Sequence, residues 1–315
     1  MQADQIWHWQ GPQHQLLEVG WCSQESSQHS GPALVLIHGF GANTNHWRHT
    51  IPALSRHATI YALDLIGFGS SSQPRALLQN DDEVVHQDGA LRYSFDLWGE
   101  QVADFCREVV QQPVVLVGNS IGGVVALRAS QLLKASPGNS PCRSVVLIDC
   151  AQRLMDDKQL ATQPAWMAWI RPLLKTLVAQ RWLSSALFRN AARPGVIERV
   201  LRQAYPSGGN RDDALVELLY RPTQRQGAAE AFRGFINLFD DHLAPDLLKT
   251  LTVPVDLIWG EHDPWEPLSE AQNWAERFPV VRSLHVIATA GHCPHDECPD
   301  QVNTLLLECL HKSSD

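Results

Sequence analysis

Three side chains, a serine, an aspartate and a histidine, have the types and spacing that nucleophilic catalysis requires. Residues 118–122 read Gly-Asn-Ser-Ile-Gly, which fits the pattern G-x-S-x-G around Ser120. An apolar run, 113–117, precedes this pattern, and a stretch rich in small residues, 124–129, follows it. That order predicts a strand, a tight turn and a helix, with the serine hydroxyl exposed at the carboxyl end of a sheet. We therefore interpret Ser120 as the nucleophile of an acyl transfer.

A serine hydroxyl is a weak nucleophile at neutral pH, so it needs a base to take its proton and an acid to orient that base. Asp263 follows the apolar run 253–259, and His292 follows the run 283–287. Serine, acid, histidine is the chain order expected when a serine hydrolase is built on a parallel sheet. Both residues would stand in loops at the carboxyl ends of strands, at the same edge as Ser120. We predict a catalytic triad of Ser120, Asp263 and His292.

Alternative roles for these residues are open. Asp149, at the end of the apolar run 144–149, is a second choice for the acid, and Glu261 is a weaker one. Asp263 would otherwise be an aspartate that caps a helix, and His292 would be a histidine in a surface loop. The triad therefore depends on whether the fold brings Asp263, rather than Asp149, to His292.

The negative charge of a tetrahedral intermediate requires two backbone donors. The N–H of Ile121 directly follows the nucleophile at the start of a helix, where the helix dipole favours negative charge. Segment 38–41 (His-Gly-Phe-Gly) follows the apolar run 33–37, and the Phe40 N–H within it is the simplest second donor. We predict an oxyanion hole made by Phe40 and Ile121, with His38 in a structural role.

The crowded segment 292–298 (His-Cys-Pro-His-Asp-Glu-Cys) raises the question of a metal site. Tetrahedral zinc needs three or four converging ligands, and this spacing matches no common zinc site. A glycine-rich phosphate loop is also missing, because the glycines near Ser120 serve the turn. We expect neither a metal nor a cofactor.

Apolar segments of strand length alternate with segments of helical character along most of the chain. We predict strands at 6–10, 16–22, 33–37, 59–63, 113–117, 144–149, 253–259 and 283–287. We predict helices at 43–54, 95–110, 124–129, 268–278 and 301–311, with Ser94 as an N-cap. Residues 73–92 are polar without periodicity and predict an exposed insertion, and 135–141 a loop. The alternation indicates an α/β fold with a mostly parallel sheet flanked by helices.

The alternation stops between residues 151 and 245, where only helical patterns occur. Apolar residues recur there at three- to four-residue spacing, and Pro172 is predicted to begin a second helix rather than to lie inside one. A helical insertion at this point of the chain would cover Ser120. We therefore divide the chain into a first core part, 1–150, a helical cap, 151–245, and a second core part, 246–315.

Charge and cysteine content restrict the partners and the compartment. The 315 residues carry a net charge of -9 without a polybasic tract, which argues against nucleic acid as a partner. The cap has 13 Lys+Arg against 9 Asp+Glu, so it is positive and the rest of the chain carries -13. Seven cysteines form no paired spacing, and neither a signal peptide nor a transmembrane segment is recognisable. We expect reduced thiols and a cytoplasmic location.

Four segments carry a resemblance to a known family: 93–98 (Tyr-Ser-Phe-Asp-Leu-Trp), 118–123, 260–265 and, most specifically, 290–297 (Ala-Gly-His-Cys-Pro-His-Asp-Glu). In these segments the chain resembles the α/β-hydrolases and, among them, the pheophytinase and chlorophyll dephytylase group of plants and cyanobacteria. The resemblance implies an α/β-hydrolase fold with an inserted helical cap. It also implies hydrolysis of the phytyl ester of pheophytin or chlorophyll, which releases phytol, with Ser120 as the nucleophile.

The substrate that this resemblance implies is large, flat and apolar, and aromatic side chains of the cap offer surface for stacking. We expect substrate contacts from Trp166, Trp169 and Phe235 in particular. The alternative for each of these residues is that it packs the cap onto the core.

Basic residues alternate with the tryptophans of the cap, namely Arg171, Lys175 and Arg181. Such a pattern is typical of a helix that lies at an anionic lipid surface. A further hypothesis is therefore peripheral contact with a membrane, which would be a photosynthetic membrane if the resemblance extends to the substrate.

Two other functions stay open. The Gly-Asn-Ser sequence before a helix of small residues is also similar to hydrolases that cleave carbon–carbon bonds in vinylogous ketoacids. From a different class, the chain would be an inactive hydrolase fold that serves as a binding module. Dehalogenases and epoxide hydrolases with an aspartate nucleophile are disfavoured, because position 120 is a serine.

Overall fold

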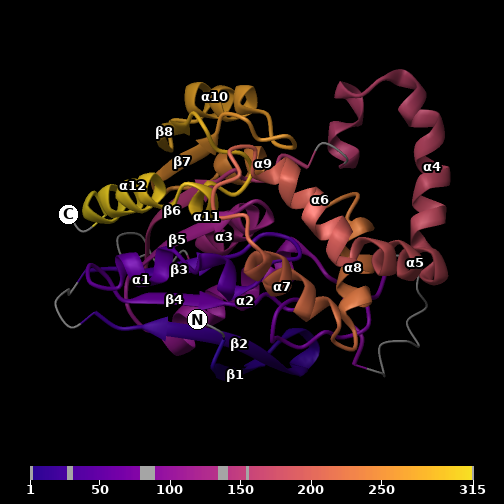
Figure 1. Cartoon of the computed structure of the whole chain (residues 1–315), viewed down its shortest axis with the longest axis horizontal. Helices are drawn as coiled ribbons and strands as arrows, with labels where there is room; N and C mark the ends of the chain where they lie inside the picture. Colours follow the sequence, from indigo (N-terminus) through magenta and orange to yellow (C-terminus); the bar gives the residue numbers. More distant parts are fainter. Residues whose placement is uncertain (1–2, 27–30, 79–88, 134–140, 154–155, 314–315) are drawn as a thin grey trace.

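The computed structural model describes residues 3–26, 31–78, 89–133, 141–153 and 156–313 and is built on one sheet (Figure 1). The strands of the described residues follow the order β1-β2-β4-β3-β5-β6-β7-β8. Strands β1 and β2 are antiparallel to each other, β2 is antiparallel to β4, and the remaining neighbours are parallel. The bounds are Gln5–Gln10 (β1), Leu16–Gln24 (β2), Ala33–Ile37 (β3), Ile60–Leu63 (β4), Val114–Asn119 (β5), Cys142–Ile148 (β6), Val255–Gly260 (β7) and Val281–Ile287 (β8). The predicted α/β fold with a mostly parallel sheet is confirmed.

Helices cover both faces of the sheet, as a parallel sheet requires, because its central strands bury side chains on both sides. Every residue of β3 and of β5 is buried. One face packs against α2, α3 and α10, and the other packs against α1 and α12. The bounds are Thr50–Leu54 (α1), Phe95–Phe105 (α2), Ile121–Leu132 (α3), Leu268–Arg277 (α10), Pro294–Glu297 (α11) and Pro299–His311 (α12). Those two apolar layers fix the strands whose carboxyl ends carry the candidate site.

Local signals located most helix boundaries. The Ser94 hydroxyl accepts a hydrogen bond from the Leu97 N–H, so Ser94 is the N-cap of α2, which continues as one π-helical turn at Cys106–Val110. The single helix predicted at 43–54 is wrong, because this segment forms a short 3-10 helix, Thr44–Trp47, followed by α1. Pro52 lacks the N–H that a continuous helix would need there, so α1 begins with this proline in its first turn.

The insertion predicted at 73–92 is only partly described. Its described ends are only partly exposed, since Ala76 and Leu91 lie in a β-bridge and are 0% and 6% exposed, whereas Arg75 and Arg92 are exposed. Residues 79–88 lie outside the described part of the chain, as does nearly all of the loop predicted at 135–141.

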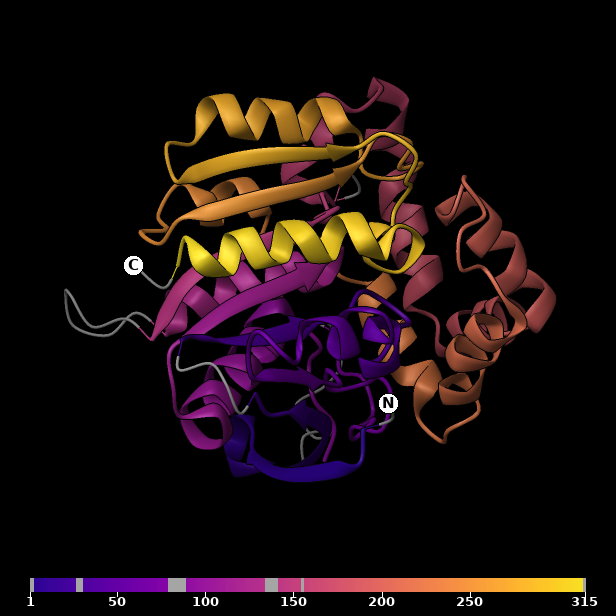
Figure 2. The ribbon, with the colours of Figure 1, turned by 60° about the vertical axis from the view of Figure 1, so that its left-hand side comes forward.

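Between β6 and β7 the described residues form helices only. Their bounds are Asp157–Thr162 (3-10), Ala165–Ala179 (α4), Arg181–Ala191 (α5), Pro194–Ala204 (α6), Asp213–Thr223 (α7), Ala228–Ile236 (α8) and Ala244–Leu248 (α9). Figure 2 shows α4 to α8 beyond the ends to which the arrows of β7 and β8 point, whereas α9 packs against α3 on one face of the sheet. The helical segment thus stands over the carboxyl edge of the sheet, and its division from the core at 151 and 245 stays a prediction.

Pro172 lies inside α4, so the prediction that it begins a second helix is wrong. A proline in a helix removes one backbone hydrogen bond and bends the helix without having to end it. The apolar spacing on either side of Pro172 is continuous, which a single bent helix satisfies as well as two helices do.

Two further observations concern the whole of the described chain. None of its helices has the length and apolar character that crossing a lipid bilayer demands. The seven cysteines, all of which are described, form no disulfide.

Candidate active site

Ser120 occupies the sharp turn between β5 and α3. Its backbone has φ 56° and ψ -123°, a conformation that residues other than glycine adopt only at a cost, and the residue is 8% exposed. A Cβ on Gly118 would lie 2.1 Å from the Gly122 carbonyl oxygen, and one on Gly122 would lie 2.4 Å from that of Ile37. The predicted strand, turn and helix are confirmed, and close backbone contacts explain the glycines two residues before and after the serine.

The loop after β3 lies against this turn. A Cβ on Gly39 would be 3.1 Å from the Ser120 Cβ, so the backbone around Gly39 is in contact with the serine. Phe40 follows Gly39, and Ile121 is the first residue of α3. Both N–H groups that we predict as oxyanion donors therefore belong to segments that meet at Ser120.

His38 is a structural hydrogen-bonding residue, in agreement with the sequence interpretation. Its Nδ1 donates to the Gly39 carbonyl oxygen at 2.8 Å, and its Nε2 accepts from the Leu65 N–H at 3.0 Å. Burial lowers the pKa of His38 to about 4, so the ring is neutral at physiological pH and holds the loop with both nitrogens.

Asp263 and His292 form a close pair. Asp263 follows β7 and His292 follows β8, and the His292 Nδ1 lies 2.7 Å from the Asp263 Oδ2. The other carboxylate oxygen, Oδ1, accepts from the N–H groups of Trp265 and Glu266 at 2.8 and 3.1 Å. Burial acts to raise the pKa of Asp263, but the hydrogen bond and charge of His292, with help from the backbone donors, outweigh it and lower that pKa. Asp263 is thus an ionised partner that fixes the orientation of the ring.

Of the three candidate acids, Asp263 is the one that contacts His292. Nδ1 of His292 faces Asp263, whereas Asp149 lies behind that carboxyl group and accepts from the Gly260 N–H at 2.9 Å. Glu261 is exposed. Asp263 also caps the local turn through Oδ1, so the capping role weighed from the sequence accompanies the contact with His292.

Asn119 connects the serine turn to the histidine loop. Its side-chain amide donates to the carbonyl oxygens of Ile148 at 3.2 Å and of His292 at 3.0 Å. The Ser120 carbonyl oxygen in turn accepts from the Ala151 N–H at 3.0 Å. The carboxyl ends of β5, β6 and β8 are therefore bonded together at this point, and they bring Ser120 and His292 to one edge of the sheet.

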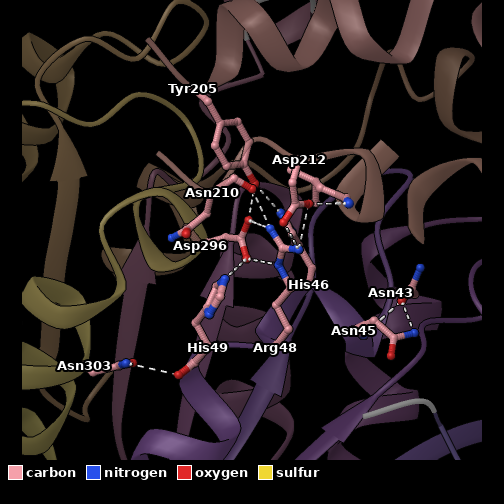
Figure 3. A network of polar contacts seen from close by, with 11 residues as sticks. Asn43, Asn45, His46, Arg48, His49, Tyr205, Asn210, Asp212, Asp296 and Asn303 are labelled. Carbon is pink, nitrogen blue, oxygen red and sulfur yellow. Dashed lines mark hydrogen bonds and ion pairs between the residues drawn. The ribbon is translucent and has the colours of Figure 1, made fainter. Parts of the chain in front are cut away.

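A polar network joins this edge to the cap, and the sequence did not predict it. Asp296 accepts from Arg48 Nε at 2.8 Å and from the Tyr205 hydroxyl at 3.1 Å, and Arg48 also contacts Asp212 at 3.0 Å (Figure 3). The Tyr205 hydroxyl lies 2.8 Å from His46 Nε2. We call Arg48, Asp296, Tyr205 and Asp212 the core–cap network.

The segment 290–297 thus does more than supply a histidine. Glu297 accepts from the N–H and hydroxyl of Ser207 and from the Gly291 N–H, and the His292 N–H donates to the Ala204 carbonyl oxygen at 2.9 Å. The acidic side chains of this segment, Asp296 and Glu297, hold the residues at and after the end of α6. In the sequence, the adjacent acidic residues Asp296 and Glu297 shortly after His292 were the signal that could have indicated this contact with the cap.

The aromatic residues predicted to contact substrate are divided by the fold. Phe235 stacks on Phe40, with ring centroids 4.0 Å apart, beside the predicted oxyanion loop. Trp166 and Trp169 instead lie on an outward face of α4 and are 58% and 86% exposed. The structure brings Phe235, and neither tryptophan, to the loop that contacts Ser120.

An apolar cavity of about 230 Å³ opens between the Phe40 loop and the cap. Its walls come from the loops after β3 and β4 and from helices α5 to α8. They include Phe40, Phe68, Phe188, Ile197, Leu201 and Phe232. The aliphatic residues of α6 carry no distinctive sequence signal, so sequence analysis missed them.

The fold and the geometry of this edge define a class of protein. The chain belongs to the α/β hydrolase fold family, which it matches over residues 32–299, and it is a hydrolase of that fold. It is similar to the chloroplastic pheophytinase of Arabidopsis thaliana, with 26% identity over 87% of this chain and 60% of the relative. It is also similar to the pimeloyl-[acyl-carrier protein] methyl ester esterase of Aeromonas hydrophila, with 30% identity over 86% of this chain and 92% of the relative. Among solved structures, a thermophilic esterase from Thermogutta terrifontis superposes with a TM-score of 0.70 at 20% identity, covering 99% of this chain and 100% of that one.

Proposed function

We propose that this chain is a serine hydrolase of carboxylic esters that removes phytol from pheophytin or chlorophyll, or cleaves a related large apolar ester. The observation that carries the reaction class is the pairing of His292 Nδ1 with Asp263 at the edge of the sheet where the strained Ser120 turn ends β5. That arrangement is the one a serine nucleophile needs for its base and for the acid behind the base.

The proposed reaction uses side chains and backbone of this chain alone. Ser120 attacks the ester carbonyl while His292 takes its proton, and Asp263 stabilises the imidazolium that forms. The N–H groups of Phe40 and Ile121 bind the oxyanion. His292 then passes the proton to the leaving alkoxide, and water repeats the sequence on the acyl-enzyme to free the carboxylic acid.

Two observations support a large apolar substrate. The cavity between Phe40 and the cap is lined by aliphatic and aromatic side chains, which favours an apolar group on the ester. The similarity to a pheophytinase favours a phytyl ester, although this chain spans 60% of the length of that relative. Phytol is a branched apolar alcohol, so such a cavity suits its chain.

The proposal is tested with purified protein and a panel of esters. Pheophytin, chlorophyll and aryl esters with acyl chains of increasing length are incubated with the protein, and the products are separated by chromatography. We expect phytol release from a pigment, and an increase of kcat/KM with chain length. Cleavage of short aryl esters alone would support the assignment as an ester hydrolase and contradict the pigment as its substrate. If a vinylogous ketoacid, added to the panel, were the one compound cleaved, the protein would be a carbon–carbon bond hydrolase instead. No turnover of any compound would favour a binding module.

We also propose that the cap meets a membrane, by a different contact from the one the sequence suggested. Arg171 and Lys175 both pair with Asp157, and Arg181 pairs with Glu230. The basic residues that alternate with the tryptophans are thus engaged with the protein's own carboxylates, so the membrane contact that we propose does not depend on them.

An apolar stripe on α4 is the surface that we propose to contact the membrane. Figure 1 shows α4 far from the sheet, and its exposed large side chains recur at helical spacing: Trp166, Trp169, Ile170, Leu173 and Leu177. Trp and Leu on one face of a helix are typical of segments that lie in the interfacial region of a bilayer. The positive charge of the cap, against -13 for the rest of the chain, would orient this face toward an anionic surface.

Replacing Trp166 and Trp169 together by alanine is expected to weaken binding to anionic vesicles at least about tenfold, because two interfacial aromatic side chains are lost. The measurement is flotation with vesicles that contain or lack anionic lipid. Leu16→Ser, which removes an exposed apolar side chain from β2, serves as the matched control and should float like the wild type. The membrane proposal would be contradicted if the wild-type protein stayed in the unbound fraction with both kinds of vesicle. It would also be contradicted if the apolar stripe of α4 were buried in a dimer interface.

A further inference from the structure

We propose that Asp149 is a positioning residue that carries a proton and donates it in a hydrogen bond to Asp263, which holds Asp263 toward His292. This inference rests on the proposed function, because it assigns a role behind the proposed acid. In this role the carboxyl group of Asp149 is a neutral hydrogen-bond donor and not an alternative acid of the triad.

The position of Asp149 supports a contact of this kind. It directly follows β6, which pairs with β7, and Asp263 stands in the loop after β7. Asp149 has a backbone φ of 43° and is 0% exposed, so its side chain has no access to water. A side-chain hydrogen bond joins its carboxyl group to that of Asp263. The two acids are therefore direct neighbours in the interior.

Hydrogen bonding distinguishes the two carboxyl groups. Asp263 accepts from two backbone N–H groups and from His292, so its negative charge is well satisfied. Asp149 accepts from the Gly260 N–H through Oδ1 only, and in the described part of the chain no donor reaches its Oδ2. Two carboxylates in contact repel each other strongly, so a proton between them is favoured. The group with fewer donors is the one that keeps it.

The surrounding charges agree with this placement of the proton. Burial, and then the charge of Asp263, raise the pKa of Asp149 well above the usual range. Glu266 is the other acid nearby, and burial raises its pKa to about 8. Titratable groups near Asp149 also include the thiols of Cys150 and Cys293, whose pKa values burial raises, while His292 lies on the far side of Asp263. None of these acids and thiols supplies a positive charge that would stabilise an Asp149 carboxylate.

A donor behind Asp263 has a defined effect on the base. It shares the negative charge of Asp263 and keeps that carboxylate from rotating away from the His292 ring. Without the donor, the charge of Asp263 would be concentrated on the oxygen that faces Nδ1. The imidazolium would then be stabilised more strongly, and a higher pH would be needed to free the base.

The test compares three substitutions at one position with the wild type. Asp149→Asn keeps a neutral donor, whereas Asp149→Leu and Asp149→Ala remove it. We expect Asp149→Asn to retain kcat within about threefold, and the two variants without a donor to lose roughly tenfold or more in kcat, with little change in KM. Their acid limb of kcat/KM should move to higher pH, and that of Asp149→Asn should stay. Rates are divided by the concentration of protein that a fluorophosphonate labels, so misfolded protein does not contribute.

The outcomes separate this inference from the proposed function. If Asp149→Asn is as inactive as Asp263→Asn, Asp149 contributes a negative charge and the inference is wrong. It is equally wrong if Asp149→Leu or Asp149→Ala matches the wild type in kcat and in the acid limb. If neither of these two variants folds, Asp149→Asn is compared with the wild type at alkaline pH. The wild-type Asp149 loses its proton there and the asparagine cannot, so kcat of Asp149→Asn should fall at a higher pH than kcat of the wild type. Identical pH profiles of kcat would overturn the inference. A wild type that cleaves no ester and takes up no label contradicts the proposed function instead.

Discussion

Replacing Ser120 by alanine is expected to lower kcat for ester hydrolysis by about 10⁴-fold or more, with little change in KM. The hydroxyl is the only group of the proposed triad that forms a covalent bond to substrate. Removal of Oγ leaves the backbone turn intact, so the substrate still binds. The measurement is steady-state hydrolysis of a short aryl ester together with labelling by a fluorophosphonate.

Ser130→Ala is the matched control for this experiment. Ser130 is also a buried serine of the helix that Ser120 precedes, and it lies in the last turns of α3. We expect this variant to retain both activity and labelling. If Ser120→Ala hydrolysed the ester at the wild-type rate, or took up the label, the nucleophile would have to be sought elsewhere.

Asp296→Ala is expected to lower the free energy of unfolding by about 3–5 kcal/mol, because it removes the buried carboxylate partner of the Arg48 guanidinium and leaves only the exposed carboxylate of Asp212. The Asp296 side chain is 0% exposed, that of Arg48 is 17% exposed, and Arg48 Nε and Asp296 Oδ1 lie 2.8 Å apart. Tyr205 loses the acceptor of its hydroxyl at the same time. Urea unfolding followed by tryptophan fluorescence measures the change.

A second substitution isolates the buried contact from the exposed one. Asp212 contacts the same Arg48 but is 54% exposed, and an asparagine there can still cap α7. Asp212→Asn should therefore cost no more than about 1 kcal/mol. Equal losses from Asp212→Asn and Asp296→Ala would show that burial of the core–cap network does not matter for stability.

The features that sequence analysis predicted well are local in the chain. The turn at Ser120 follows from an apolar strand, two glycines at fixed spacing and a helix of small residues, all within residues 113–129. Asp263 and His292 could be placed because each comes directly after a strand of a parallel sheet, where side chains from distant segments converge. Periodicity and turn residues were sufficient for these assignments.

The features that were missed depend on pairs of residues far apart in the chain. Arg171 looked like a lipid-facing cation because helical spacing says nothing about Asp157, which lies outside the helix and takes up its charge. Arg48 and Asp296 are 248 positions apart, and nothing in either neighbourhood points to the other. Trp166 was expected near the substrate because aromatic character does not tell which side of a cap helix faces the core.

The contact between the His292 N–H and the Ala204 carbonyl oxygen restricts how a bulky molecule can reach the interior. The end of α6 is hydrogen-bonded to the short segment that carries the His292 imidazole. An outward movement of that end of α6 would therefore displace His292 relative to Ser120. For the ester substrate that we propose, we therefore expect entry, and departure of the alcohol, on the side of the cap where α4 and α5 lie.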